Sequence, residues 1–583
     1  MTDMNEKAIQ RAVMALLGGL AGMALWGLVE ILPDRIENER VLLGIAAAAG
    51  AFFVSLLAMA GPLGPRWAVA LAPLVAIPAT LLLLWGSFRF DEVGPYMESG
   101  QPVFAFSALV FIPLPYLIAW RMAPDWRDYQ TLFNESWSIV VRFVVAWTFV
   151  GLFWAVLFFS DALLQIVGLE IIEDLLDIEP VPYIMTGMML GLALAVVNEM
   201  SDYVSPFLAI RLLRLLLPFV LVVLAIFVAA LPFRGLSGLF GGLSAAGTLM
   251  AAAVGAVTLV TSALDAWDEE ATESPLMKLA AQAMALMIPV LTLLAFWAVA
   301  LRVQQYGWTP TRVAAATAAG ILSLYAVAYA GSVVMRTDWM GRIRRANGVL
   351  ALVLLSVAAL WLTPAINAQW LSAASQLSRL ERGAVSVDEV DLWSIGREWG
   401  RAGKAALARM ENMDLDDSER LKERLALLEA SSSRWEFESG RGGTRDATID
   451  EFISKLVVRP EGIALEASMF ATGYGMVDGW VQSCDRRTPE GNPGCLALVV
   501  DLLPKSPGDE VLLFTQVYGD RVSVQAFTSR NRETLDLASV ISGTWGGFQD
   551  PSLIDRLHAG DFRVGAPTAR AIFSGDVELS ITP

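Results

Sequence analysis

Charged side chains beside apolar segments are the first candidates for chemistry in this sequence. Glu199 and Asp202 follow one apolar segment, and Arg211 and Arg214 begin the next. The two arginines are three residues apart, so on a helix they share one face. Ionisable groups at membrane depth are usually paired or functional, which leaves an ion or substrate path open. Long side chains at the ends of membrane helices also reach the aqueous interface, and anchoring is our leading interpretation.

Two further acidic stretches lie between apolar segments. One contains Asp265, Asp268, Glu269, Glu270 and Glu273, and we expect it to be a solvated connector rather than a cation site. The other, residues 160–180, has no basic residue but has apolar residues at three- and four-residue steps. This spacing is typical of an amphipathic helix at the membrane interface.

Motifs for metals, nucleotides and nucleic acids are absent or incomplete in the sequence. His558 is the only histidine and there are two cysteines, so neither a zinc site nor a histidine-based triad is expected. Residues 396–406 differ from a phosphate-binding loop, because Glu398 replaces the first glycine and Ala405 follows Lys404. We therefore expect no cofactor. The net charge of −17, without a basic stripe, argues against nucleic acid as a partner.

The elements that must position these residues are long apolar helices. The chain is 55% hydrophobic, and a membrane span takes about 20 mainly apolar residues. We predict eleven spans within a transmembrane domain of residues 1–366: 12–32, 41–60, 67–86, 101–120, 138–160, 181–198, 207–231, 237–262, 276–301, 313–335 and 346–366. The first follows Lys7 and Arg11 and lacks a small-residue cleavage pattern, so we interpret it as a retained signal anchor.

Orientation follows from basic residues in the short loops. With the N-terminus inside, thirteen lysines and arginines lie on the cytoplasmic side and six on the other, as the positive-inside rule requires. An odd number of spans then places the C-terminal region outside. Cys484 and Cys495, separated by a short polar loop, are within reach of a disulfide, which is typical of the periplasm. The alternative is two unrelated small apolar residues.

Beyond the spans, the sequence predicts three further parts. Residues 367–430 contain three helical runs and form a short stalk, and residues 431–448 have the composition of a linker. Residues 449–583 form a mainly β extramembrane domain, with a tight turn at Gly519-Asp520. Its strand-like segments are 454–460, 462–470, 479–484, 495–503, 510–519, 521–529 and 577–583.

One motif gives a resemblance to a known family. It lies in residues 301–313 and comprises Tyr306, Gly307, Trp308, Thr309, Pro310 and Arg312. With the flanking residues 230–240 and 363–383, it resembles a bacterial family of integral membrane proteins catalogued as domain of unknown function 4153, most clearly over residues 195–385. The resemblance implies a polytopic membrane protein and transfers no catalytic residue. From the residues alone, Tyr306 and Trp308 suit an interfacial aromatic belt, and Thr309-Pro310 begins the next helix.

Three functional hypotheses remain open. The first is a multi-spanning protein of the bacterial inner membrane, not an enzyme, that acts as an envelope sensor, scaffold or assembly factor. It would lie in the lipid bilayer and contact a periplasmic protein through its exported C-terminal domain. The alternative is a transporter or lipid-handling protein that uses the charges at 199–214. A membrane enzyme that uses the carboxylates at 170–179 is the third.

Overall fold

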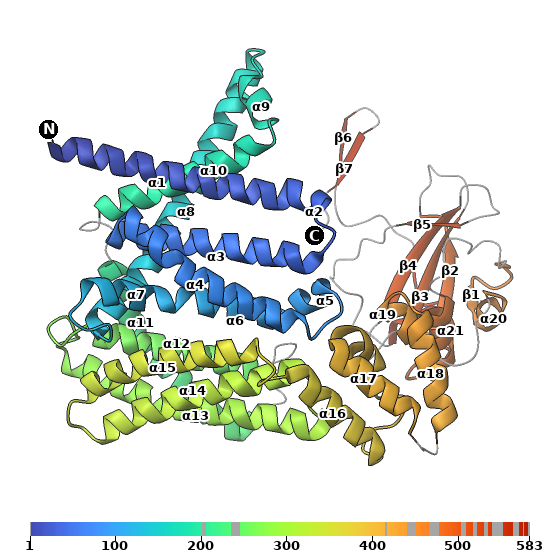
Figure 1. Ribbon diagram of the computed structural model, residues 1–583. Coiled ribbons are helices and arrows are strands. Elements are labelled where there is room, and N and C mark those ends of the chain that lie inside the picture. The colour runs from blue at the N-terminus through green and yellow to red at the C-terminus, as the bar shows by residue number, and fades with distance from the viewer. Residues whose placement is uncertain are drawn as a thin grey trace. The chain divides into compact units, whose positions relative to one another are not determined.

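A computed structural model gives the fold (Figure 1). It describes most of the chain: residues 2–200, 206–234, 245–413, 417–439, 449–465, 477–502, 509–516, 522–529, 535–538, 552–563, 571–574 and 577–580. The chain divides into two compact units, Met1–Leu428 and Glu429–Pro583, and each is described by itself.

The first unit contains the membrane helices. Eleven helices in the described part of the chain are long and apolar enough to cross a bilayer, so the predicted span count is confirmed. They are α1 (Thr2–Trp26) with η1 (Gly27–Ile31) and α2 (Leu32–Arg35); α3 (Glu39–Leu63); α4 (Pro65–Ser87); α6 (Gln101–Phe111) with α7 (Pro113–Met122); α8 (Tyr129–Ile166); α10 (Pro180–Glu199); α11 (Pro206–Arg234); α12 (Ala245–Leu264); α13 (Pro275–Tyr306); α14 (Pro310–Val334); and α15 (Trp339–Trp361).

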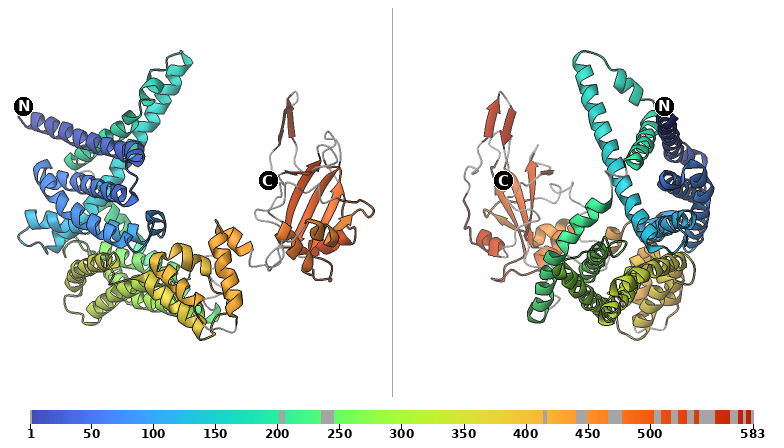
Figure 2. Two further views of the ribbon diagram at one scale, coloured as in Figure 1. Left: turned by 45° about the vertical axis from the view of Figure 1, so that its right-hand side comes forward. Right: turned by 90° about the vertical axis from the view of Figure 1, so that its left-hand side faces the viewer.

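The acidic stretch 160–180 differs from the single amphipathic helix that we predicted. The 38-residue helix α8 continues to Ile166, and only the six-residue α9 (Ile171–Leu176) follows before α10 begins. Figure 2 shows α8 as the long cyan helix that leads to this turn. The apolar residues do recur at helical spacing, but they belong to the last turns of α8 and to α9. Gly168, with a positive φ of 75°, separates these two helices.

Glycines hold α1 against α10. Gly18 and Gly22 on α1 face Gly187 and Gly191 on α10, and the two helices run antiparallel. A Cβ on Gly18 would lie 2.0 Å from the carbonyl oxygen of Gly187, and a Cβ on Gly191 would lie 2.1 Å from that of Met14. In lipid there is little hydrophobic drive between helices, so close backbone approach at small residues supplies the packing energy. Each of the two helices thus has a G-x-x-x-G pattern at the contact.

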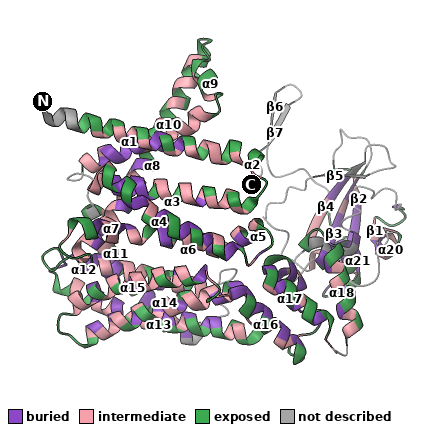
Figure 3. Ribbon diagram, in the orientation of Figure 1, coloured by how far each residue is buried: buried purple, intermediate pink, exposed green. Residues whose placement is uncertain are grey.

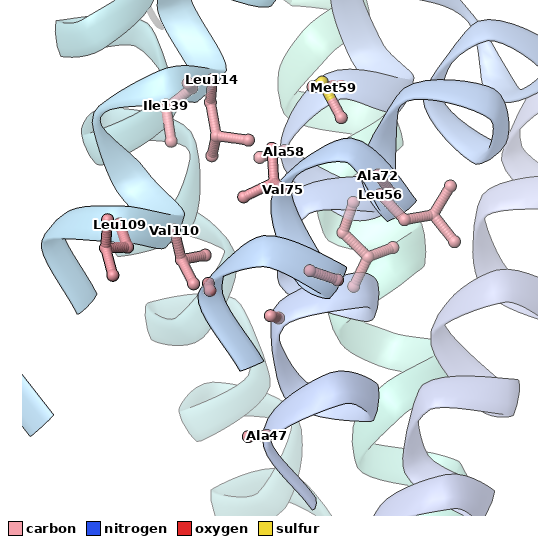
Figure 4. Close-up of a cluster of buried hydrophobic side chains, with 14 of the residues drawn as sticks. Ala47, Leu56, Ala58, Met59, Ala72, Val75, Leu109, Val110, Leu114 and Ile139 are labelled. Atoms are coloured by element: carbon pink, nitrogen blue, oxygen red, sulfur yellow. The ribbon is translucent and has the colours of Figure 1, made fainter. Parts of the chain in front are cut away.

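Two apolar cores lie inside the bundle. One is built mainly on α3, α4, α6, α7, α8 and α10, and Figure 4 shows Ala58, Ala72, Val75, Leu114 and Ile139 gathered in it. The other joins α11 to α15 and is rich in alanines of α12 and α13. Many large apolar residues of the spans remain exposed, and Figure 3 marks the exposed positions along these helices in green. A bilayer would cover these residues.

The helices after the last span pack onto one end of the bundle and are called the collar: α16 (Ala368–Glu381), η2 (Ser394–Glu398), α17 (Gly400–Glu411) and α18 (Ser418–Ala430). The three helical runs predicted for residues 367–430 are therefore present, within the same compact unit as the spans as far as Leu428. Arg89 donates hydrogen bonds to the carbonyls of Trp361, Thr363 and Ile366. The N–H of Arg401 in turn donates to the Arg89 carbonyl at 2.9 Å. The bundle end that these helices cover is called the collar end.

Gly400 allows the close contact between α17 and the loop after α4. Its φ is +56°, and a Cβ there would lie 2.6 Å from the carbonyl oxygen of Arg89. Asp91 in the same loop accepts from Arg401 at 3.0 Å and from Lys404 at 2.6 Å. The stretch that superficially resembles a phosphate-binding loop is thus a helix that docks onto the membrane unit.

The second unit is built on a five-stranded sheet in the order β1-β2-β3-β4-β5, in which only β1 and β2 are parallel. Its strands are β1 (Val457–Arg459), β2 (Cys495–Val500), β3 (Glu510–Gln516), β4 (Val522–Ser529) and β5 (Leu535–Ala538), with a separate pair β6 (Ala571–Ser574) and β7 (Val577–Ser580). The helices are α19 (Arg434–Ser439), α20 (Ile449–Lys455), α21 (Val477–Asp485) and α22 (Ser552–His558). The predicted strand at 462–470 is not formed at 462–465, and its remainder and the turn at Gly519-Asp520 lie outside the described residues.

One strand prediction was wrong. Residues 479–484 belong to the helix α21. Val477, Trp480, Val481 and Cys484 are all buried, and their spacing of three, four and seven residues is helical rather than alternating. The ring of Trp480 packs 5.0 Å from Phe452 and lies between α21 and the sheet.

Candidate functional site

The charges predicted at 199–214 do not form one site. Glu199 is paired with Arg11 at 2.5 Å, and Arg214 is paired with Asp265 at 2.6 Å. Arg211 lies over the ring of Phe207, with its Cζ 3.8 Å from the ring centroid. Asp202 lies outside the described residues. The described members of the group therefore anchor separate helices.

Asp265 is not the solvated residue that we expected. Its side chain is 4% exposed, and its carbonyl oxygen accepts from Nε of Arg344 at 3.1 Å. Arg344 also forms an ion pair with Asp268 at 2.6 Å. These contacts join α11, α15 and the end of α12, because each arginine is positioned by a different helix. The expectation of a solvated connector is thus wrong for Asp265, since its two arginine partners are distant in sequence.

A neutral network lies beside these ion pairs. The hydroxyl of the fully buried Tyr329 donates to Oδ1 of Asn347 at 2.7 Å and lies 3.0 Å from the hydroxyl of Thr261. The amide of Asn347 donates to the Tyr129 hydroxyl at 3.1 Å. A satisfied buried network of this kind fixes helix positions. We therefore interpret this end of the bundle as a structural clamp rather than a pathway.

The motif at 306–312 forms the tight connection between α13 and α14. Gly307 has a φ of +74°, and a Cβ there would lie 2.6 Å from Cδ of Arg379 on α16. The amide of Gln376 donates to the carbonyls of Tyr306 and Trp308 at 2.9 and 3.0 Å. Only glycine fits this turn at low cost. The motif therefore docks the collar helix α16 onto the spans.

Each remaining motif residue has a distinct place in this turn. Thr309 caps α14 by accepting from the N–H of Arg312, and Pro310 is the first helical residue, as predicted. Tyr306 is 54% exposed, whereas Trp308 packs against an apolar core of the bundle. Arg312 donates to the carbonyl of Gly307 at 2.7 Å.

A cavity of about 1170 Å³ opens beside this turn, at the collar end of the bundle. Its walls come from the ends of α6, α13 and α14, from the loop that contains α5 (Val93–Glu98), and from the collar. The charged and aromatic side chains that line it are Arg312, Arg379, Arg397, Glu92, Glu98, Glu389, Asp391, Glu398, Tyr306, Trp393 and Trp399. A concave surface that carries aromatic rings and charges of both signs offers contacts to a ligand with charged groups. The cavity was not predicted, because its walls come from segments up to about 300 residues apart in sequence.

Two carbonyl oxygens in the cavity wall lack hydrogen-bond partners. Oε1 of Gln369 and Oε1 of Gln101 are both buried and accept no hydrogen bond from the described residues. Gln369 is only 6% exposed. A buried acceptor without a donor costs about 1–3 kcal/mol, so these two amides lower the stability of the cavity wall.

Nearby titratable groups stabilise the collar. Hydrogen bonds from Lys404 and Arg401 hold the pKa of Asp91 below its usual value. Burial lowers the pKa of Arg89, which nevertheless donates to three carbonyls at the end of α15 and beyond. Among the residues that the structure describes, no group of three or more histidine, cysteine or acidic side chains could hold a metal ion.

In the second unit, Cys484 and Cys495 form a disulfide with a Cα–Cα distance of 4.6 Å. The loop that it closes is also held by α22. Asp555 accepts hydrogen bonds from the hydroxyl of Thr488, from the amide of Asn492 at 2.8 Å and from the N–H of Glu490 at 3.3 Å. Nε2 of His558 lies 3.3 Å from the carbonyl oxygen of Pro493.

Two side chains of α22, Asp555 and His558, have shifted pKa values. Burial alone would raise the pKa of Asp555, but the hydrogen bonds from the loop outweigh it and lower this pKa. Burial lowers the pKa of His558, and the charge of Arg459 acts in the same direction. Neutral His558 and ionised Asp555 are thus the forms that suit the folded loop.

Comparison with known proteins gives one match. The model of the family described as domain of unknown function (DUF4153) matches residues 19–410. This range contains the second to eleventh spans, the turn at 306–312 and the cavity, and it ends within α17. No curated protein matches the chain. No solved structure matches it either.

Proposed function

We propose that this chain, a member of the DUF4153 family with eleven helices long and apolar enough to span a membrane, is a non-enzymatic protein of the bacterial cell envelope. In this proposal the bundle lies in the inner membrane with the N-terminus in the cytoplasm. The collar and the C-terminal unit face the periplasm. The C-terminal unit contacts a protein partner, so that the chain acts as a sensor, scaffold or assembly factor.

One observation carries the proposal: a separately packed C-terminal unit with a disulfide follows an odd number of spans. The bond joins α21 to β2, and both cysteines lie in the core of the sheet. Disulfides persist in the periplasm and are rare in the cytosol. The bias of basic residues supports the same orientation independently.

The arrangement of span ends supports a strict alternation through the membrane. The collar end gathers the ends of the third, fourth, ninth, tenth and eleventh spans around Arg89, the cavity and α16. The opposite end gathers Arg11 with Glu199 and Arg214 with Asp265. With eleven alternating crossings, the span ends at the collar would all lie on one side of the membrane and the span ends at the opposite end of the bundle on the other, as they do here. The collar therefore shares its side with the chain that leaves the last span.

Thiol labelling in intact cells tests the orientation. Both cysteines are buried, so the reduced thiols react as the unit opens transiently. With long exposure, a membrane-impermeant maleimide should label Cys484 and Cys495 only after reduction with a reductant that stays outside the inner membrane. The variant with both cysteines replaced by serine is the control and should never be labelled. Labelling that requires a permeabilised inner membrane would place the C-terminal unit in the cytosol and refute the proposal.

A second measurement tests the partner. A photo-crosslinking residue at the exposed Glu490, in the disulfide-closed loop, should give a discrete crosslinked product in cells. The same residue at the exposed Arg345, at the opposite span end, is the matched control. Loss of the Glu490 product on reduction would show that the folded loop is recognised. Identical products at both positions would contradict a specific partner of the C-terminal unit.

The alternative, a transporter or lipid-handling protein that uses the charges at 199–214, has weaker support. Glu199 and Arg214 each have their own partner on another element. Pro289 and Pro218, which could interrupt helices, lie inside the continuous helices α13 and α11. Transporter sites are often built from discontinuous helices.

A further inference from the structure

Three arginines gather around Tyr306 at the edge of the cavity. Arg302 lies on the last turns of α13 and Arg312 on the first turn of α14. Their Cζ atoms are 5.7 and 5.5 Å from the centroid of the Tyr306 ring. Arg379 comes from α16, and its side chain passes directly over Gly307. Three elements thus bring three positive charges to one place.

None of these arginines has a carboxylate within ion-pair distance among the described residues. Arg312 donates to the Gly307 carbonyl, and Arg379 donates to the carbonyls of Gln304 and Gln305 at 3.4 and 2.8 Å. At the opposite span ends, by contrast, Arg142, Arg214 and Arg344 each have a carboxylate partner. In a chain with a net charge of −17, unneutralised and mutually repelling arginines favour an anionic ligand.

Other residues of the cavity wall are negatively charged and favour a cationic group of the ligand. Glu92 and Glu98, at the two ends of α5, are exposed to the cavity. A ligand that satisfies these carboxylates must carry a positive charge opposite them. A simple anion would satisfy the arginines but leave the carboxylates without a partner.

The position of the cavity points to the membrane as the source of this ligand. Three of its wall elements are the ends of spans, and Tyr306, the last residue of α13, is 54% exposed. Trp370 on α16 is 62% exposed. Exposed aromatic residues at span ends are typical of the headgroup level of a bilayer. Acyl chains could therefore remain in the bilayer while a headgroup enters the cavity.

We propose that this cavity binds the headgroup of a phospholipid that ends in an ammonium group. The phosphate lies against Arg312 and Arg379, which line the cavity, and the nearby charge of Arg302 strengthens its attraction. The ammonium group faces Glu92 and Glu98. The cavity volume is sufficient for such a headgroup, since ligand sites commonly measure about 300–1,000 Å³. This inference does not depend on which side of the membrane the collar faces.

Binding of short-chain lipids to the purified full chain in detergent tests the proposal. Dihexanoyl phosphatidylethanolamine should bind more tightly than the phosphatidylglycerol and phosphatidylcholine of equal chain length. Arg379→Gln should weaken its binding about 10- to 100-fold, because a charge-assisted hydrogen bond is lost. Glu98→Gln should reduce the preference for the ethanolamine headgroup over the glycerol headgroup. Arg345→Gln, an exposed arginine paired with Asp338 at the opposite span ends, should change neither quantity.

Two further variants guard against misfolding. Arg302→Gln removes a charge whose described contact is the Tyr306 ring, so it should weaken binding while leaving the melting temperature unchanged. Arg379→Lys keeps the charge and should retain more binding than Arg379→Gln. Equal binding of all three lipids, or unchanged binding in both Arg302→Gln and Arg379→Gln, would overturn the proposal. Full competition by inorganic phosphate alone would identify a site for free phosphate and overturn the lipid assignment.

Discussion

Reduction of the Cys484–Cys495 bond should destabilise the C-terminal unit by about 2.8 kcal/mol. The two cysteines are 11 residues apart in sequence. In the chain-entropy model, a bond that closes a loop of this length removes about 9 cal/mol/K of entropy from the unfolded state, which gives this value at 25 °C. A difference of about 2.8 kcal/mol corresponds to about a 100-fold change in the unfolding equilibrium.

The structure indicates where the effect will appear. The bond joins α21 to β2, and Cys495, the first residue of β2, pairs with Thr515 of β3. Asp555 holds the loop between the cysteines independently of the bond. We therefore expect the native contacts to survive reduction, while the unfolded chain gains freedom. Slow-exchanging amides of α21, β2 and β3 should all be affected together, because these elements share one core.

Hydrogen exchange of the full chain in lipid nanodiscs, followed by mass spectrometry, measures this effect. Amides in residues 477–485 and 495–500 should exchange about 100-fold faster after reduction. Peptides from α13 in the membrane unit serve as an internal control and should not change. Replacement of both cysteines by alanine should give at least the same acceleration, because the buried sulfur atoms are also lost.

Two results would refute this reasoning. Acceleration of less than about fivefold in the protected core would mean that the bond contributes little to the stability of the unit. Equal acceleration in α13 would mean that reduction acts on the whole chain and not through closure of this loop.

Two further predictions follow from close packing and from titration. Gly191→Leu should separate α1 from α10, since a Cβ there would lie 2.1 Å from the Met14 carbonyl. It should cost about 1–3 kcal/mol, measured as a lower melting temperature, whereas Gly50→Leu, where the space is open, should be tolerated. Burial and Arg459 lower the pKa of His558, against the opposing charge of Asp555. The neutral imidazole therefore stabilises the folded unit fully above about pH 6.5, and this contribution to the free energy of unfolding falls as the pH drops below that value. Exchange of residues 552–563, corrected for its intrinsic pH dependence, should therefore accelerate from pH 7 to pH 5 in the wild type but much less in His558→Gln.

The membrane spans could be predicted from the sequence because their signal is local. A run of about 20 apolar residues meets the physical requirement of the bilayer by itself, and each of the eleven runs contains a helix in its described residues, residues 237–244 of the eighth run lying outside them. The start of α14 was likewise local, since Thr309 and Pro310 supply a cap and a first helical residue. The helix α21 was predicted as a strand, although its apolar residues have helical spacing, because its apolar run is short and lies among strand-like segments.

Contacts between distant segments could not be predicted in this way. Asp265 is buried because Arg214 and Arg344 reach it from helices 51 and 79 residues away. Charge pattern in one loop does not reveal these partners, so the acidic loop was expected to be solvated. The α1–α10 contact is an intermediate case: both G-x-x-x-G patterns are visible in the sequence, but nothing local shows that they face each other.

The residues of the motif at 306–312 have two different explanations. Gly307, Thr309 and Pro310 are explained by the turn, the cap and the first residue of α14. Arg312 is different, because its bond to the Gly307 carbonyl uses one nitrogen of a guanidinium group that can donate five hydrogen bonds. A turn that needed only this bond would not require a charge beside Arg302 and Arg379, which repel it. The extra charge is therefore better explained by what enters the cavity than by the architecture of the turn.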